Sequence, residues 1–109
     1  MSFELRSIQV FEKQAKRLLK KFPSLKQELR ALRNDLIKDA MRGTSLGNNC
    51  YKIRLAIASK GKGKSGGAGI ITHVVVMNKL VYLLNIYDKS EQADLPSKEL
   101  DRLVRSIHS

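Results

Sequence analysis

The sequence predicts an α+β fold, an antiparallel sheet with helices packed on it. Two stretches near the start repeat apolar residues every three or four positions, which is the spacing of amphipathic helices. Three later stretches alternate apolar and polar residues or are rich in β-branched residues, which is typical of strands. Helices that precede a run of strands are typical of α+β architecture, and the 109 residues are enough for a single domain, residues 1–109, with one core.

The first expected elements are a short strand and two helices. Residues 3–8 alternate apolar and polar side chains, so we expect a strand with one buried face. Helical spacing follows as far as Phe22, where Pro23 disfavours helical backbone in the residue before it and ends the helix. Ser24, with Gln27 three residues later, resembles a capping box and predicts the start of a second helix. Because the connection is short, the two helices should be antiparallel neighbours.

The remaining expected elements are three strands and a last helix. Residues 43–49 have the composition of a loop. Strands are expected over the ranges 51–57, 70–77 and 80–87. Asn78 and Lys79 are placed as a two-residue turn of a tight hairpin. The final helix has Ser97 as its candidate cap, followed by apolar residues at helical spacing.

The charge distribution indicates a polyanionic partner. The chain has 21 Lys and Arg against 10 Asp and Glu, a formal net charge of +11, and such an excess repels itself in a compact fold. No carboxylate occurs from Ala40 to Tyr87, whereas a solvated helix usually mixes both signs of charge. Contact with the phosphates of a nucleic acid explains such a stretch. A basic protein without a polyanionic partner is the alternative.

Several other classes of function lack the residues that they need. Cys50 is the only cysteine, and no cluster of histidine, cysteine and carboxylate residues has metal-ligand spacing, so we expect no disulfide, no metal and no cofactor. The apolar runs are too short to cross a membrane and the N-terminus lacks the apolar stretch of a signal peptide, so we expect a cytoplasmic protein that does not bind membranes. Residues 58–65 nearly match a nucleotide-binding P-loop, but Ala58 replaces its first glycine and a strand follows instead of a helix.

RNA cleavage fits the side chains that are available. The 2′-hydroxyl of RNA attacks the neighbouring phosphate, so the protein has only to move protons and stabilise charge. Candidates for this chemistry in or near the strands are Lys52, Arg54, Lys64, His73, Tyr87 and Lys89. Each has a structural alternative, because a strand lysine or arginine can be merely solvated, a strand histidine merely packed, and a strand-end tyrosine merely a boundary residue.

A second group of candidates lies in the Gly-rich segment 60–67. Its three lysines, Lys60, Lys62 and Lys64, form a cationic finger among glycines that can contact RNA phosphates. We place His73 with them as an RNA contact. The alternative is that this segment is only the tip of a hairpin.

Three segments resemble the RelE/HigB toxins of bacterial type II toxin–antitoxin systems. They are YKIRL at 51–55, GKSGG at 63–67 and YLLNIYDKSEQADL at 82–95. The resemblance implies a RelE-like domain, in which an N-terminal helical hairpin and a C-terminal helix pack on a twisted antiparallel sheet. It implies a metal-independent, ribosome-dependent endonuclease that cuts mRNA in the ribosomal A site. It also implies a cognate helix-turn-helix antitoxin as partner.

The resemblance further implies roles for single residues. Lys52 and Arg54 match a basic pair on the central strand that suits proton abstraction and phosphate binding. Lys89 matches a basic position at the end of the last strand. Tyr87 belongs to the matching block, although its catalytic role varies among relatives.

Gly69 departs from the family pattern. It stands where the family has an arginine that contacts the scissile phosphate, so we expect attenuated cleavage. The alternative is that Lys62 or Lys64 takes over this role. Two other functions stay open, namely a toxin of the same fold that acts on DNA gyrase and a non-catalytic basic module that binds RNA.

Overall fold

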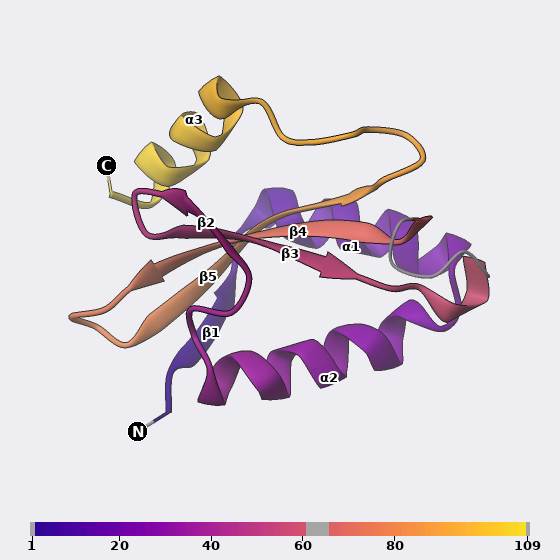
Figure 1. The fold of residues 1–109 in the computed structure, drawn as a ribbon, viewed down its shortest axis with the longest axis horizontal. Helices are drawn as coiled ribbons and strands as arrows, with labels where there is room; N and C mark the ends of the chain where they lie inside the picture. Colours follow the sequence, from indigo (N-terminus) through magenta and orange to yellow (C-terminus); the bar gives the residue numbers. More distant parts are fainter. Residues whose placement is uncertain (1, 61–65, 109) are drawn as a thin grey trace.

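The computed structural model describes residues 2–60 and 66–108, in which a five-stranded sheet lies between helices on both of its faces (Figure 1). The elements in chain order are β1 (Glu4–Ser7), α1 (Gln9–Lys21), α2 (Leu25–Lys38), β2 (Thr44–Gly47), β3 (Cys50–Leu55), the 3-10 turn η1 (Ala58–Lys60), β4 (Ala68–Val75), β5 (Leu80–Asp88) and α3 (Ser97–His108). The predicted α+β class is confirmed.

The sheet is mixed, which corrects the prediction of an antiparallel sheet. The strand order is β1-β5-β4-β3-β2. The four strands from β5 to β2 are antiparallel neighbours, but β1 pairs in parallel with β5, with Leu5 opposite Val81. The predicted loop at 43–49 also contains the edge strand β2. Its residues are exposed throughout, so no apolar alternation marks it in the sequence.

The helical hairpin of α1 and α2 covers one face of the sheet. Leu18, Leu25 and Leu36 are fully buried and belong to one cluster with Ile70 and Ile86 of the central strands. Each such leucine stabilises the fold by about 1.5–3 kcal/mol through removal of apolar surface from water. The expected packing of the hairpin on the sheet is therefore confirmed.

The boundaries of the two helices agree with those predicted from the sequence, but the predicted cap of α2 does not form. Phe22 is the C-cap of α1 and has extended backbone (φ −125°), as Pro23 requires of its predecessor. The Ser24 side chain accepts no hydrogen bond from the backbone amides at the start of α2, so the predicted capping box is absent. Its hydroxyl donates instead to Oε1 of Glu28 (3.1 Å) and lies 2.9 Å from Oγ of Ser59, which ties α2 to η1.

The opposite face of the sheet carries α3. Leu103 and Val104 of this helix pack on Cys50, Ile71 and Leu84, which confirms the expected C-terminal helix. α3 lies toward the end of the sheet that bears the hairpin between β4 and β5, so it leaves the far ends of β3 and β5 to other segments (Figure 1). Among the described residues, no helix has the length and apolar character needed to cross a membrane.

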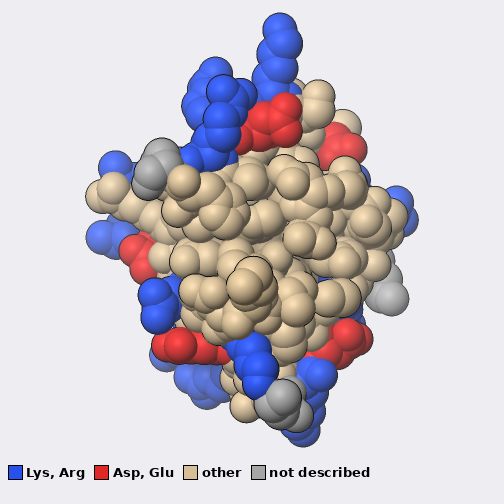
Figure 2. Space-filling model, turned by 90° about the vertical axis from the view of Figure 1, so that its left-hand side faces the viewer, with Lys and Arg blue, Asp and Glu red and all other residues tan. Residues whose placement is uncertain are grey.

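Charged side chains are spread unevenly over the surface. Figure 2 shows the end of the molecule that carries the β4–β5 hairpin, where a broad uncharged area is bordered above and below by charged side chains of both signs. The turn of this hairpin exposes Val76 and Met77. Within residues 2–60 and 66–108, the middle of this end of the molecule therefore offers no basic surface to a polyanion.

Candidate active site on the sheet

Lys52, Arg54 and Tyr87 come from neighbouring strands and share one face of the sheet. Arg54 of β3 pairs with Gly69 of β4, which in turn pairs with Tyr87 of β5. Successive side chains of a strand point to opposite faces, and Ile53 packs under the helical hairpin. Lys52 and Arg54 therefore lie on the face away from the hairpin, near the ends of β3 and β5 that α3 leaves uncovered.

A carboxylate joins this group from a distant part of the chain. Nζ of Lys52 lies 3.3 Å from Oδ1 of Asp94, and the hydroxyl of Tyr87 donates to the same oxygen at 3.3 Å. Asp94 belongs to residues 89–96, the linking segment between β5 and α3. We define the candidate site as Lys52, Arg54, Gly69, Tyr87 and Asp94. Sequence reasoning missed Asp94, because nothing in its spacing shows that the linking segment folds back over β3.

The ionisation of the site follows from these contacts. The backbone amide of Leu95 donates to the Asp94 carboxylate (2.9 Å) and, together with Lys52, holds the pKa of Asp94 below its usual value against the effect of burial. Burial raises the pKa of Tyr87, and Lys52 opposes this only partly. At neutral pH the site therefore contains an ionised carboxylate and a protonated phenol.

Gly69 makes room for the ring of Tyr87. A Cβ atom at position 69 would lie 2.3 Å from Cζ and 2.5 Å from Oη of Tyr87, so the ring lies directly against the backbone of β4. Any larger residue has to swing the ring away, and this includes the arginine that the resemblance predicts. The residue at position 69 thus controls where the Tyr87 hydroxyl lies relative to Lys52.

Lys89 adjoins the candidate site through its backbone. It follows β5 directly, and its amide donates to the carbonyl oxygen of Gly67 (3.0 Å). This hydrogen bond extends the pairing of β4 with β5 by one step beyond the pair of Ala68 and Asp88. Lys62 and Lys64 lie outside the described residues.

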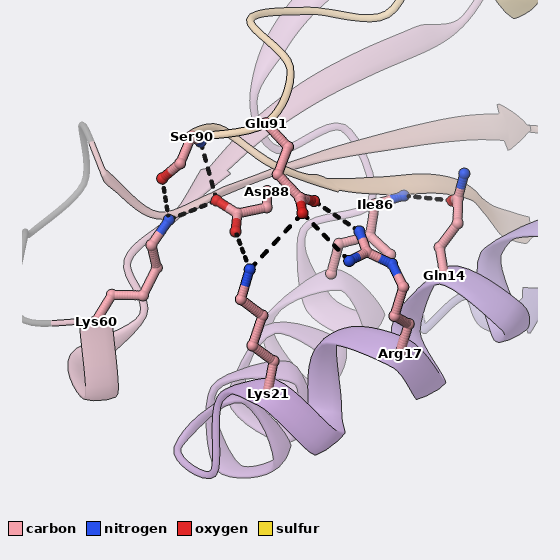
Figure 3. A network of polar contacts seen from close by, with 8 residues as sticks. All are labelled: Gln14, Arg17, Lys21, Lys60, Ile86, Asp88, Ser90 and Glu91. Carbon is pink, nitrogen blue, oxygen red and sulfur yellow. Dashed lines mark hydrogen bonds and ion pairs between the residues drawn. The ribbon is translucent and has the colours of Figure 1, made fainter.

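Lys60 lies away from the candidate site, in contact with Asp88 and Ser90. Its ammonium lies 2.5 Å from Oδ1 of Asp88 and 2.8 Å from Oγ of Ser90 (Figure 3). Asp88 pairs with Ala68, which packs under the helical hairpin, and Lys21 of α1 also reaches Asp88 at 3.7 Å. Lys60 is therefore a buried counter-ion on the hairpin side of the sheet, which its Gly-rich surroundings in the sequence did not reveal.

The same polar network anchors the linking segment to α1. The guanidinium of Arg17 donates two hydrogen bonds to the carboxylate of Glu91, at 2.7 and 3.3 Å, and Lys21 lies 3.7 Å from Glu91 (Figure 3). The start of the linking segment is thus held on the hairpin side of the sheet. Its continuation crosses to the other side, where Asp94 meets Lys52.

His73 shares a face with Lys52 but lies beneath α3, apart from the candidate site. It is buried, with Nδ1 3.4 Å from Sγ of Cys50 and Nε2 2.9 Å from Nε2 of His108. Burial, and then the nearby His108, lower the pKa of His73, and burial raises the pKa of the Cys50 thiol to about 11. His73 thus packs α3 onto β4. In the part of the chain that the structure describes, no group of three or more His, Cys, Asp or Glu side chains is arranged to hold a metal ion.

The protein is expected to become less stable as the pH falls below about 6.5, the pKa of an unperturbed histidine. Because the pKa of His73 is lower in the folded state, the unfolded chain binds more protons between the two pKa values, and the free energy of unfolding drops as the pH decreases through that window. Urea unfolding followed by circular dichroism at several pH values measures this. The His73→Gln variant should lose most of the dependence, and an unchanged dependence would assign it to other groups.

The whole chain is similar in structure to a bacterial toxin. The solved structure is a double-arginine-to-alanine mutant of the E. coli toxin RelE in the free state, with a TM-score of 0.62 and 14% sequence identity, covering 98% of this chain and 99% of that chain. The sequence matches no protein-family model. At this identity the similarity establishes the fold, so the chain has the RelE-like α+β fold that its three sequence segments imply.

Proposed function

We propose that this protein is a ribosome-dependent mRNA endonuclease, the toxin of a bacterial type II toxin–antitoxin pair that acts in the cytoplasm. The observation that carries the proposal is the grouping of Lys52, Arg54 and Tyr87 on one face of a RelE-like sheet. The absence of carboxylates from residues 40–87 supports it, because this stretch supplies β3 and β4 with cations alone. A cognate helix-turn-helix antitoxin is the expected protein partner.

The side chains of the candidate site match the steps of RNA cleavage. The 2′-oxygen loses its proton and attacks phosphorus, and the 5′-oxygen of the next nucleotide leaves with a proton, which yields a 2′,3′-cyclic phosphate and a 5′-hydroxyl. Arg54 is always charged and stabilises the phosphoryl oxygens. Lys52, charged beside Asp94, stabilises the 2′-oxygen as its proton passes to water, and Tyr87, kept protonated by burial, donates a proton to the 5′-oxygen. Lys89 is proposed as a further RNA contact.

Primer extension on a translated mRNA tests the proposal. Adding the purified protein to translating ribosomes should produce new RNA 5′ ends within the coding region, and the same mRNA without ribosomes should stay intact. A non-catalytic RNA-binding module would bind RNA in a salt-sensitive way but produce no new ends. A toxin that acts on gyrase would change plasmid supercoiling and leave the mRNA whole. Either of these two results overturns the proposal.

We also propose that Gly69 attenuates the enzyme, because a glycine lacks the guanidinium that the resemblance predicts at this position. In the same assay, the Gly69→Arg variant should cleave about tenfold faster, which is less than the full effect of one charge-stabilising donor because the new side chain displaces the Tyr87 ring. The Gly69→Gln variant displaces the ring without adding charge and serves as the control. Equal rates for the two variants would show that the missing charge is not what limits cleavage.

A further inference from the structure

In the free protein, a carboxylate already occupies the donors of the candidate site. Oδ1 of Asp94 accepts from the Tyr87 hydroxyl and lies next to the Lys52 ammonium, at 3.3 Å from each. A carboxylate and a phosphate both present anionic oxygens to such donors. The two groups therefore compete for Lys52 and Tyr87.

We propose that Asp94 stands where a phosphate group of RNA binds, so that RNA must displace this carboxylate from Lys52 and Tyr87. The inference rests on the proposed function for the identity of its ligand. It makes Asp94 an internal competitor of the substrate.

The exposure of the two side chains fits a displacement of Asp94 while Lys52 stays in place. The side chain of Asp94 is 64% exposed, whereas that of Lys52 is 16% exposed. The carboxylate thus lies at the mouth of the site, and the ammonium lies at its floor. Because its carboxylate is mostly exposed to water, this ion pair contributes little free energy, so a phosphate that brings further contacts can replace the carboxylate.

Two structural features hold Asp94 over the site until RNA arrives. Its carbonyl oxygen accepts a hydrogen bond from Nε2 of Gln92 (2.9 Å), within the linking segment that Arg17 anchors through Glu91. Gly69 lets the Tyr87 ring lie flat against β4, with its hydroxyl directed at the carboxylate. The competing carboxylate is therefore built into the resting fold.

The salt dependence of RNA binding shows whether Asp94 competes with RNA for Lys52 or acts only as one more negative charge on the surface. A phosphate that binds Lys52 releases the counterions that it held in solution, which steepens the plot of log affinity against log salt by about 0.7 for single strands. In the original protein the carboxylate displaced from Lys52 takes up a solvent cation, which offsets this release. In the Asp94→Asn variant there is no carboxylate to displace, so the full contribution is measured.

The experiment uses a fluorescent single-stranded RNA with 2′-O-methyl riboses, which the protein cannot cleave, and measures binding by anisotropy at several salt concentrations. The Asp94→Asn variant should bind about three- to tenfold more tightly, the range expected when one exposed ion pair no longer competes. Its salt slope should be steeper by about 0.7. Asparagine still accepts from the Leu95 amide, so the linking segment keeps its turn.

The control is Asp101→Asn, which removes an exposed carboxylate from α3 and changes the net charge equally. It should alter affinity by less than about twofold and leave the salt slope unchanged. In a Lys52→Gln background, Asp94→Asn should also lose its effect. Equal affinities and slopes for the two single variants, or weaker binding by Asp94→Asn, would overturn the inference. Because the RNA cannot be cleaved, these outcomes are independent of primer extension, whose failure would overturn only the nuclease proposal.

Discussion

Replacing Lys52 by alanine is expected to slow ribosome-dependent mRNA cleavage by about two to three orders of magnitude, the usual effect of removing one group that stabilises transition-state charge. Lys52 is the cation at the floor of the candidate site, next to Tyr87 and Asp94. The loss should therefore appear in the rate at which new 5′ ends accumulate at saturating protein. The folded state should be affected by less than about 1 kcal/mol, because its charged partner is exposed.

The matched control is Lys26→Ala, which removes an exposed lysine from α2 on the other side of the sheet. Both variants lose the same charge and the same side chain. Lys26→Ala should cleave translated mRNA at nearly the original rate. Equal rates for Lys52→Ala and Lys26→Ala would show that Lys52 takes no part in the chemistry.

Replacing Asp88 by alanine is expected to destabilise the fold by about 3–5 kcal/mol, because it leaves a buried ammonium without its counter-ion. The side chains of Asp88 and Lys60 are only 2% and 7% exposed. Burial alone would raise the pKa of Asp88, but the hydrogen bonds from Lys60 and Ser90 outweigh it and lower the pKa. The stabilisation is thus present at neutral pH and is lost only as the pH falls through that lowered value.

A second ion pair in the same protein provides the comparison. Arg42 and Asp35 are 2.6 Å apart, close to the separation of Lys60 and Asp88, but their side chains are 47% and 53% exposed. In urea unfolding, Asp35→Ala should therefore cost less than about 1 kcal/mol. Removing both buried charges, as in Asp88→Ala with Lys60→Met, should recover part of the loss. Similar costs for Asp35→Ala and Asp88→Ala would mean that burial does not govern the strength of these pairs.

Local patterns predicted most elements of this fold, because backbone preferences act between neighbouring residues. Pro23 fixes the end of α1 through its own ring, and the alternation in β3 fixes which side chains point away from the hairpin. The partner of β1 could not be predicted, because its pairing with β5 depends on the path of the whole chain. Ser24 has the residue type of a cap, yet the approach of Ser59 and Glu28 gives its hydroxyl other partners.

In the candidate site, too, local sequence patterns place some residues, whereas others depend on contacts between distant parts of the chain. Lys52 and Arg54 are two residues apart on one strand, so alternation alone puts them on one face, whereas Tyr87 joins them through the pairing of β3, β4 and β5. Local sequence could not place Asp94 in the site or Lys60 against Asp88, because each is positioned by an ion pair between distant parts of the sequence. His73 lies on the same face as Lys52, and only the tertiary position of α3 decides that it is covered.

The parallel pairing of β1 with β5 has a consequence for biosynthesis. Glu4 is opposite Leu80, which is translated 76 residues later. Such long-range pairing forms late, because the intervening chain must first be available. The nascent polypeptide therefore cannot close its sheet, or bring Tyr87 beside Lys52, until β5 has been made. If the protein cuts messages on the ribosome, as proposed above, it would stay harmless to the one that encodes it until that point.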